Sequence, residues 1–447
     1  MPTDDPRPAF KPTWPTCEKQ ACTGAVVFGG HCLAHLGGSL DPYLGRLGPG
    51  SDIDARGTVL EESLVRRLLG GLRGADRTVF GNASFEHARF LGVVQFDNIV
   101  FGGRAVFDHA RFDEQARFIG ADFRAEARFH DTTFAGTIQF DNIRAGVLEF
   151  VNARCEKRAW FGPLVADELI VARVRCAAIT EIDVRVERLN GRFARYEEGV
   201  VIRADGGDIF AEQARFGGSS LISGTGALPR LRSLRATDVS NLEVADVDLR
   251  WCAFAGAHRL DQLRLSGRCP FGRPPRGGRT RRRTIAEESA WREWPTDRPG
   301  HWEIESVDPE RMANVYRSLR KAFEDSKNEA GAGDFYYGEM EMRRHSTDSP
   351  RAERAILWVY WLLSGYGQRA ARALAALVVL IVTVGTLLAV WGQPVAEAAQ
   401  IAVGAVVLRE PGAELTEAGQ WTVMVARVLG PVLLALAILA VRARVKR

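Results

Sequence analysis

Lysine is scarce in this chain of 447 residues, since nearly all of its 59 lysine and arginine residues are arginine, as in proteins from GC-rich bacterial genomes. Residues 1–15 are polar and rich in proline and lack the apolar core of a secretion signal. There are only seven cysteines, an odd number. We therefore expect cytoplasmic soluble parts with reduced thiols, and the length allows about three domains.

Phenylalanine recurs at steps of five and six residues from Phe85 to Phe140. On a helix, a five-residue step turns the side chain by about 140°, so no single buried stripe would form. On a strand, the residue two places before each phenylalanine must also point inward, and it is alanine, valine, isoleucine or threonine every time. The residues between them are mostly polar. The pattern therefore predicts very short strands, each followed by a corner, with four such units in a square coil of about 22 residues.

These small-then-phenylalanine pairs resemble the pentapeptide-repeat family, in its phenylalanine-rich form with an extra residue at alternate corners. The resemblance implies a mainly β solenoid, a right-handed quadrilateral β-helix, with phenylalanines stacked along a narrow core. Alternating segments continue past Phe140, so we assign the solenoid to residues 76–267, or eight or nine coils of this size.

The open ends of such a rod need covers, because unpaired strands promote aggregation. Residues 58–74 predict an amphipathic helix, and we assign residues 51–75 to a cap on the first coil. Its apolar face would comprise Leu60, Leu64, Val65, Leu68 and Leu69.

Ahead of this helix, three cysteines and a histidine have the spacing Cys-x4-Cys-x9-Cys-x2-His, with glycines that allow tight turns. Three thiolates and one imidazole suit a closed, tetrahedral, structural zinc site. We therefore predict a zinc-binding module over residues 1–50, with the ligands Cys17, Cys22, Cys32 and His35. His31 could replace His35, although the x2 spacing favours His35, and the alternative is a set of buried cysteines without a metal.

After the solenoid, residues 268–284 contain seven arginines and no acidic residue, and their proline and glycine content predicts a linker over 268–300. This segment could bind anionic lipid headgroups. The arginines concerned are Arg279, Arg281, Arg282 and Arg283. The alternatives are a solvated linker or pairing with acidic helices, and we expect no nucleic acid partner.

Residues 301–347 predict a helical connector. A first helix should start at Asp308 and Pro309 and stop at Gly331 and Gly333, followed by a second helix over 334–345. The second helix is dense in polar and aromatic residues, but no nucleophile stands beside a base. Its charged residues, Glu339, Glu341, Arg343 and Arg344, can pair along one helix. We therefore predict no catalytic residue and no bound organic cofactor. The segment resembles the connector between solenoid and membrane in actinobacterial pentapeptide-repeat membrane proteins.

The last hundred residues predict membrane association. Residues 348–371 indicate an interfacial helix capped by Ser349, with Trp358, Tyr360 and Trp361 at headgroup depth. Two apolar runs can cross a bilayer, within residues 372–392 and 423–447, and residues 393–422 form an extracytoplasmic or re-entrant loop. Arginines precede the first run and follow the second, whereas the loop between the two runs is acidic. The positive-inside rule then puts both termini in the cytoplasm of a bacterium, with two spans in the plasma membrane.

These features favour a membrane-anchored scaffold that presents a cytoplasmic β-helix to an unknown protein partner. A two-helix ion channel with the β-helix as its sensor is the main alternative, and it would require an oligomer around the pore. The expected loop lacks a Thr-x-Gly-Tyr-Gly filter, and the Gly-Tyr-Gly at 365–367 precedes the first span. A DNA mimic that binds topoisomerases would need a strongly acidic rod, but residues 76–266 hold 25 arginine and lysine residues against 27 aspartate and glutamate residues.

Overall fold

The computed structural model describes residues 10–275, 281–294, 304–410, 412 and 415–445. The chain divides into two compact units. The first contains the cysteine-rich segment and a β-rod, together with Ile285–Glu287, and the second contains the C-terminal helices.

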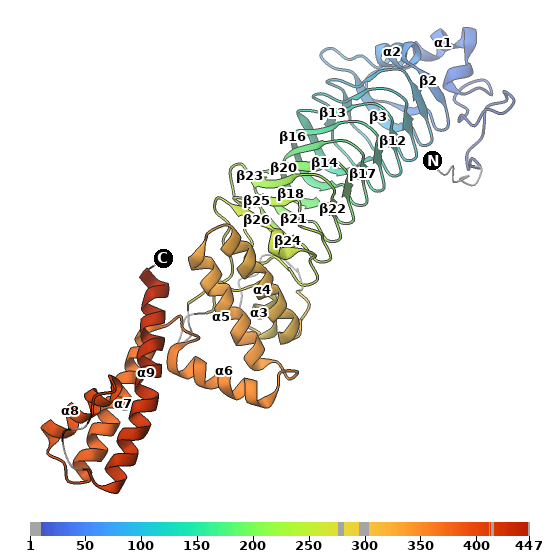
Figure 1. Cartoon of the computed structure of the whole chain (residues 1–447). Coiled ribbons are helices and arrows are strands. Elements are labelled where there is room, and N and C mark those ends of the chain that lie inside the picture. The colour runs from blue at the N-terminus through green and yellow to red at the C-terminus, as the bar shows by residue number, and fades with distance from the viewer. Residues whose placement is uncertain (1–9, 276–280, 295–303, 411, 413–414, 446–447) are drawn as a thin grey trace. The chain divides into compact units, whose positions relative to one another are not determined.

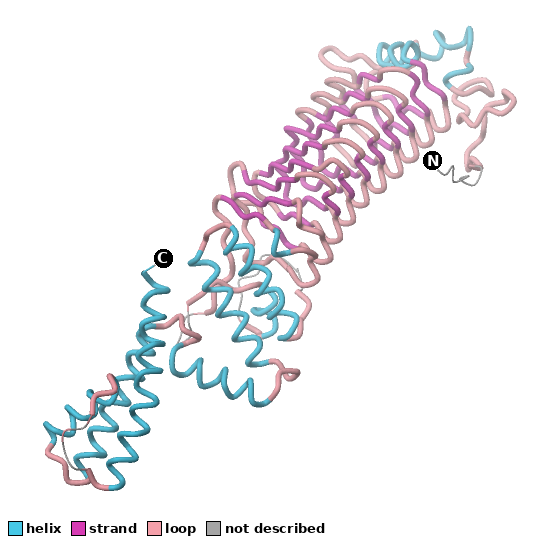
Figure 2. Tube along the Cα trace, in the orientation of Figure 1, coloured by secondary structure: helices cyan, strands magenta, loops and turns pink. Residues whose placement is uncertain are grey.

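The rod is a β-solenoid of about nine turns, built almost wholly of parallel pairs between successive coils (Figures 1 and 2). One face is an eight-stranded sheet formed by β2 (Val59–Glu61), β4 (Arg89–Leu91), β8 (Arg111–Phe112), β12 (Thr133–Phe134), β15 (Arg154–Cys155), β17 (Arg175–Cys176), β19 (Arg195–Tyr196) and β22 (Arg215–Phe216). The other faces form one eighteen-stranded sheet, made of β1 (Ser51–Asp54), β3 (Val79–Ser84), β5 (Val94–Gln95), β6 (Val100–Phe101), β7 (Ala105–Val106), β9 (Ala116–Arg117), β10 (Asp122–Phe123), β11 (Ala127–Arg128), β13 (Ile138–Phe140), β14 (Ile143–Glu149), β16 (Ala159–Ile170), β18 (Thr180–Asn190), β20 (Val200–Ala204), β21 (Asp208–Phe210), β23 (Ser220–Gly224), β24 (Arg230–Ser233), β25 (Leu242–Ala245) and β26 (Arg264–Ser266).

The phenylalanines point inward and stack from coil to coil, as predicted. Phe112 is fully buried between Phe90 and Phe134, with ring centroids 4.5 and 5.0 Å away. Phe107 stacks in the same way on Phe129, at 4.7 Å. Each ring therefore lies over the ring of the next coil, and offset stacking adds to the hydrophobic gain of filling a narrow core.

The coil shortens along the rod, which explains why the phenylalanine spacing fades from the sequence. Paired residues are 22 positions apart at Arg89 and Arg111, and 20 apart at Arg175 and Arg195. In the later coils the phenylalanine column of the eight-stranded face continues through Cys155, Cys176 and Tyr196. The strands on the other faces also lengthen there, so β16 and β18 span twelve and eleven residues.

The rod begins earlier than the sequence indicates. β1 pairs with β3, so the first coil starts at Ser51, inside the range assigned to a capping helix. The amphipathic helix itself, α2 (Glu62–Gly71), is shorter than predicted because Leu60 lies on β2, paired with Phe90. Leu60 is the first member of a phenylalanine column, and in-register pairing with the next coil outweighs its helical periodicity.

The second unit contains α4 (Pro309–Asp325), α5 (Glu329–His345), α6 (Arg351–Ser364), α7 (Ala370–Val390), α8 (Val395–Val406) and α9 (Glu417–Val445). Gly331 and Gly333 lie inside α5 and do not end α4, which contradicts the predicted stop. The helices are separated at Ser326–Asn328, where the Asn328 side chain accepts a hydrogen bond from the Gly331 amide at 3.0 Å. A β-carbon on Gly331 would lie 2.1 Å from the Phe323 ring, so this glycine permits close helix packing.

Two of the helices are long and apolar enough to cross a membrane, α7 over Ala370–Val390 and α9 over Glu417–Val441. Between them, the short apolar helix α8 packs through Ala398, Ala402 and Ala405 against side chains of both α7 and α9. α6 starts at Arg351 after Pro350, and no side chain caps it, so the predicted Ser349 cap is wrong.

Candidate metal site

Tight turns bring the four predicted metal ligands together. Cys17 follows a bridge between Thr16 and Ala25, and the chain reverses again around Gly29 and Gly30, both with positive φ. Cys32 then precedes a single 3-10 turn, η1 (Leu33–His35), which ends at the histidine. Since residues three apart share a face of a 3-10 turn, Cys32 and His35 point to the same centre.

Their ligand atoms all lie within 4.8 Å of one another. Nδ1 of His35 is 3.3 Å from Sγ of Cys32 and 3.5 Å from Sγ of Cys17. Sγ of Cys22 is 3.7 Å from Sγ of Cys32. Tetrahedral bonds of ~2.3 Å from a metal to sulfur give a sulfur–sulfur edge of about 3.8 Å, so these spacings fit one ion. Nδ1 of His31 approaches only Cys17, at 3.9 Å, and stays outside the group.

The cysteine thiols differ in pKa, and a bound cation would favour the thiolate form of each of them. Burial, together with the neighbouring Cys22, raises the pKa of the Cys32 thiol to about 12. Burial also opposes ionisation of Cys17, but hydrogen bonds from the backbone of Cys32 and Lys19 outweigh it and lower the pKa of Cys17 to about 6. A divalent ion at the centre would stabilise all three thiolates.

The module is fixed against the first coil of the rod. The Ala25 amide donates to the Arg56 carbonyl at 2.8 Å, and the Thr23 hydroxyl donates to the Gly57 carbonyl at 3.0 Å. Phe10 stacks on His87 of the next coil, with centroids 3.6 Å apart. A β-carbon on Gly24 would lie 2.9 Å from Sγ of Cys32, so only glycine fits beside the ligands.

Of the arginines expected to meet lipid, the three that the structure describes differ in exposure. Arg279 lies outside the described residues, Arg281 is exposed, and Arg283 is half-buried with its guanidinium 5.2 Å from the Phe323 ring centroid. Arg282 is buried and donates to both carboxylate oxygens of Glu288 at 2.6 Å. Arg282 therefore fits the alternative given above, pairing with an acidic helix, because the buried carboxylate of Glu288 already neutralises it.

Arg282 belongs to a buried ionic network that the sequence did not reveal. Glu288 accepts hydrogen bonds from Arg282, from Arg292 at 2.8 Å and from the Tyr316 hydroxyl. Burial opposes ionisation of Glu288, but the two arginines outweigh it and lower its pKa. The pairing was hidden because Glu288 lies in a short helix, α3 (Ala286–Trp291), that carries no periodic signal.

The network continues to Glu341 on α5. This carboxylate accepts from Arg292 at 3.1 Å, from Arg344 at 2.9 Å and from the Tyr366 hydroxyl at 3.2 Å. Glu339 pairs across to α4, with Arg317 at 2.9 Å and Arg320 at 3.0 Å. Glu341 and Arg344 therefore pair along α5 as expected, whereas Glu339 joins α5 to α4 and Glu341 also joins it to Arg292.

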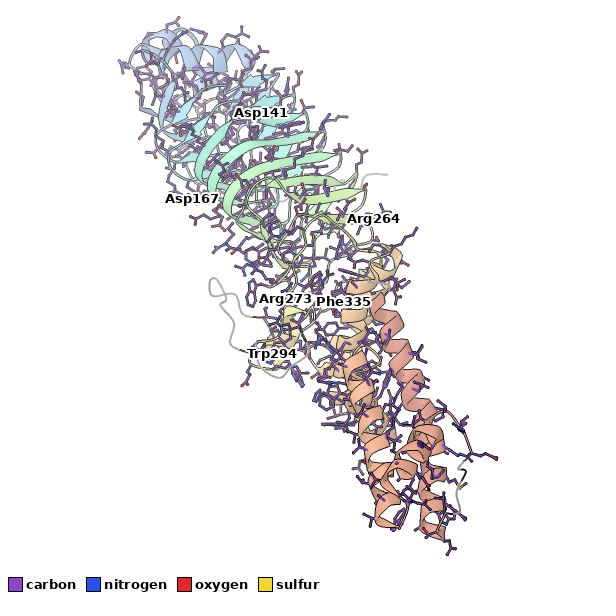
Figure 3. All side chains as sticks on the ribbon, turned by 90° about the vertical axis from the view of Figure 1, so that its left-hand side faces the viewer. Asp141, Asp167, Arg264, Arg273, Trp294 and Phe335 are labelled. Carbon is purple, nitrogen blue, oxygen red and sulfur yellow. The ribbon has the colours of Figure 1, made fainter. Side chains whose placement is uncertain are left out.

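A shallow groove of about 700 Å³ opens on the rod over β14, β16 and β18, which are its longest strands. Its floor includes Val147, Val165 and Val186, and Val165 is 51% exposed. Charged side chains surround these valines, among them Asp167, which lies at the margin of the rod in Figure 3. Of these valines Val165 is exposed, Val147 is half-buried and Val186 is buried, and an exposed apolar side chain inside a charged border suits a protein-binding surface.

Comparison with known proteins supports the repeat assignment. No curated protein and no solved structure matches the chain. Residues 96–144, which supply stacked phenylalanines in the N-terminal half of the rod, match the family described as pentapeptide repeats (9 copies).

Proposed function

We propose that this chain is a membrane-anchored scaffold whose pentapeptide-repeat rod is presented to a protein partner in the bacterial cytoplasm. The observation that carries the proposal is the apolar surface of α7 and α9. On α7, Val378, Val379 and Val382 are each more than half exposed, as are Met424 and Val428 on α9. Hydrocarbon is the solvent that removes the cost of exposing such surfaces.

The proposed orientation follows from charge. Arg369 and Arg372 precede or begin α7, whereas Glu397 and Glu417 lie at the starts of α8 and α9. Basic residues stay on the cytoplasmic side, so both termini and the rod would be cytoplasmic. The only charged residue in the apolar part of α9, Arg427, donates to the Arg409 carbonyl at 2.8 Å, which lowers the cost of its burial.

A rigid rod suits a scaffold because it offers long, regular surfaces. The groove on β14, β16 and β18 is the part best suited to a protein partner. Tethering would raise the effective concentration of whatever binds there.

Zinc is the metal that fits the N-terminal site best, with Cys17, Cys22, Cys32 and His35 as its ligands. A closed set of four protein ligands leaves no open position for a substrate, so the ion would hold the module together. The module has few buried apolar residues, and its fold would depend on the metal.

Purified full-length protein in detergent is expected to contain about one zinc ion per chain, because the four ligands form one closed tetrahedral site. Replacing Cys17 and Cys32 together with serine should abolish zinc binding, measured by elemental mass spectrometry. The same change at Cys155 and Cys176, which are buried in the rod, is the matched control and should leave the zinc content unchanged. Wild-type protein that is free of zinc yet protected from hydrogen exchange over residues 14–57 would contradict the site.

A channel is the second candidate, and α8 is the observation that favours it. A short helix between two spanning helices is the arrangement in which a pore loop can be supported. The residues after α8 nevertheless lack a Thr-x-Gly-Tyr-Gly sequence, so we favour a tether.

Exchanging residues 373–447 for an unrelated two-helix hairpin of the same topology tests the tether directly. If the helices only anchor the chain, membrane fractionation and capture of the cytoplasmic partner should match the wild type. The purified full-length protein should also carry no current in planar bilayers. Unitary currents that change with substitution of Gly404 and disappear when residues 393–422 are deleted would favour the channel instead.

A further inference from the structure

Four arginines form a column on the eight-stranded face of the rod. Arg154, Arg175, Arg195 and Arg215 start the strands β15, β17, β19 and β22, and each is in register with the next. All four are exposed, while the residue after each of them is buried. The four side chains therefore start from backbone positions that are ~4.8 Å apart from one coil to the next, and the column is about 14 Å long.

This arginine column differs from most arginines of the rod, because its four members stand in consecutive register and none has a carboxylate partner within the described residues. Elsewhere, arginines pair with a carboxylate on a neighbouring coil, as Arg158 does with Glu181, Arg185 with Asp205 and Arg192 with Glu212. Among the described residues, none of the four column arginines forms an ion pair. Glu156 and Glu197 lie two positions beyond Arg154 and Arg195, yet the structure forms no ion pair with either.

The fold does not require arginine in these positions. The same column contains Val59 at its start, Thr133 in the middle and Asp238 after Arg215. Like charges in register repel one another, so four consecutive arginines reduce the stability of the rod. A residue type that the fold neither needs nor neutralises indicates an external anion.

The surroundings of the column add positive charge. Lys157 and Arg173 are exposed close to it in the sequence, which gives six basic residues against four carboxylates, those of Glu156, Glu197, Glu198 and Asp238, and Asp238 is already paired with Arg259. The rod as a whole has a slight acidic excess, 25 basic against 27 acidic residues over 76–266. The positive charge is therefore concentrated on this face.

We propose that the arginine column binds the anionic headgroups of a phospholipid membrane and so docks one face of the rod on the bilayer surface. The proposal rests on the membrane anchoring proposed above, because a tether keeps the rod within reach of the lipid surface. Phospholipid headgroups are mobile and can gather at a row of guanidinium groups, each of which can bind a phosphate by two parallel hydrogen bonds.

Lipid fits this surface better than nucleic acid does. Specific protein–DNA interfaces bury about 1,000–2,500 Å² and are strongly basic throughout. The arginine column is one side chain wide and about 14 Å long. A small, linear cluster of positive charge on a chain that is tethered to the membrane instead matches the polybasic segments that bind acidic lipids, in which each residue contributes independently.

Arginine modification in nanodiscs tests the proposal with the full-length chain. The protein is placed in discs of phosphatidylcholine alone or with phosphatidylglycerol, treated with phenylglyoxal, and analysed by mass spectrometry at Arg154 and Arg215. We expect protection only with phosphatidylglycerol, decreasing as salt rises. Replacing Arg175 and Arg195 with glutamine should weaken docking roughly 30-fold, since each arginine contributes about one factor of five.

The matched control replaces Arg124 and Arg144 with glutamine. These arginines belong to the face of β10 and β14, two faces further along the coil, and their loss changes the net charge equally. Protection should then persist. Equal modification in both kinds of disc, or equal loss of protection in the control, would overturn the proposal. The proposal would also be wrong if inorganic phosphate or a single-stranded oligonucleotide, added to phosphatidylcholine discs, protected Arg154 and Arg215 as well as phosphatidylglycerol does.

Failure of the anchor gives a different result. A chain that does not enter the discs would contradict the proposed tether, whatever its arginines do. The same chain should then still float with phosphatidylglycerol vesicles through the arginine column, and a chain that neither enters discs nor floats would refute both proposals.

Discussion

Substitution of Phe112 by aspartate is expected to unfold the rod. The ring is fully buried between Phe90 and Phe134, and no described side chain there could pair with a carboxylate. An unpaired buried charge costs more than the roughly 5–15 kcal/mol by which domains are stable, unless the group takes up a proton, and the lost ring would still leave a cavity. The β signal in circular dichroism should decrease, and limited proteolysis should cut within the coils.

The control places the same residue on the outside. Arg144 is exposed on β14, and its replacement by aspartate should change the free energy of unfolding by no more than about 1 kcal/mol, which includes repulsion from Asp122 in register with it. If both variants were equally sensitive to protease, the assignment of inward and outward positions would be wrong.

Substitution of Glu288 by alanine is expected to destabilise the helical unit by about 3–5 kcal/mol. The change leaves Arg282, which is almost completely buried, without its carboxylate. It also removes the acceptor of the Tyr316 hydroxyl. Hydrogen exchange of the full-length protein should show faster exchange in α4 and α5, where these side chains pack.

An exposed ion pair of the same unit provides the comparison. Glu353 accepts from Arg343 at 2.6 Å, but both side chains are more than one third exposed. Its replacement by alanine should cost ~0–1 kcal/mol. Similar exchange rates in the two variants would mean that burial does not set the strength of the network.

The β-rod could be predicted because its signal is local and repeated. Each phenylalanine indicates an inward position, and the small or β-branched residue two places earlier indicates it independently. The spacing over residues 85–140 therefore distinguishes strands from a helix without any knowledge of distant contacts. The cluster of metal ligands could be predicted for a similar reason, because its residues are close in the sequence. Cys32 and His35 lie on one turn, and Cys17 and Cys22 lie on the turns before it.

Features that depend on distant partners were not predictable in this way. Leu60 fits an amphipathic helix in the sequence, and only its pairing with Phe90 makes it part of a strand. Gly331 looks like a helix stop until the Phe323 ring is placed against it. Arg282 looks like a solvated linker residue, because its partner Glu288 sits in a helix of only six residues. Local pattern thus gives the wrong answer where a tertiary contact outweighs it.

The variation in coil size has a consequence for how such rods evolve. Coils of 22 residues and of 20 residues occur in one uninterrupted stack, so a corner can gain or lose a residue while the strands beside it keep their register. Because each coil contacts only its neighbours, duplication or deletion of a whole coil would change the length by ~4.8 Å and leave both ends intact. Selection can therefore change the length of the rod in uniform steps of one coil without altering the surfaces at either end.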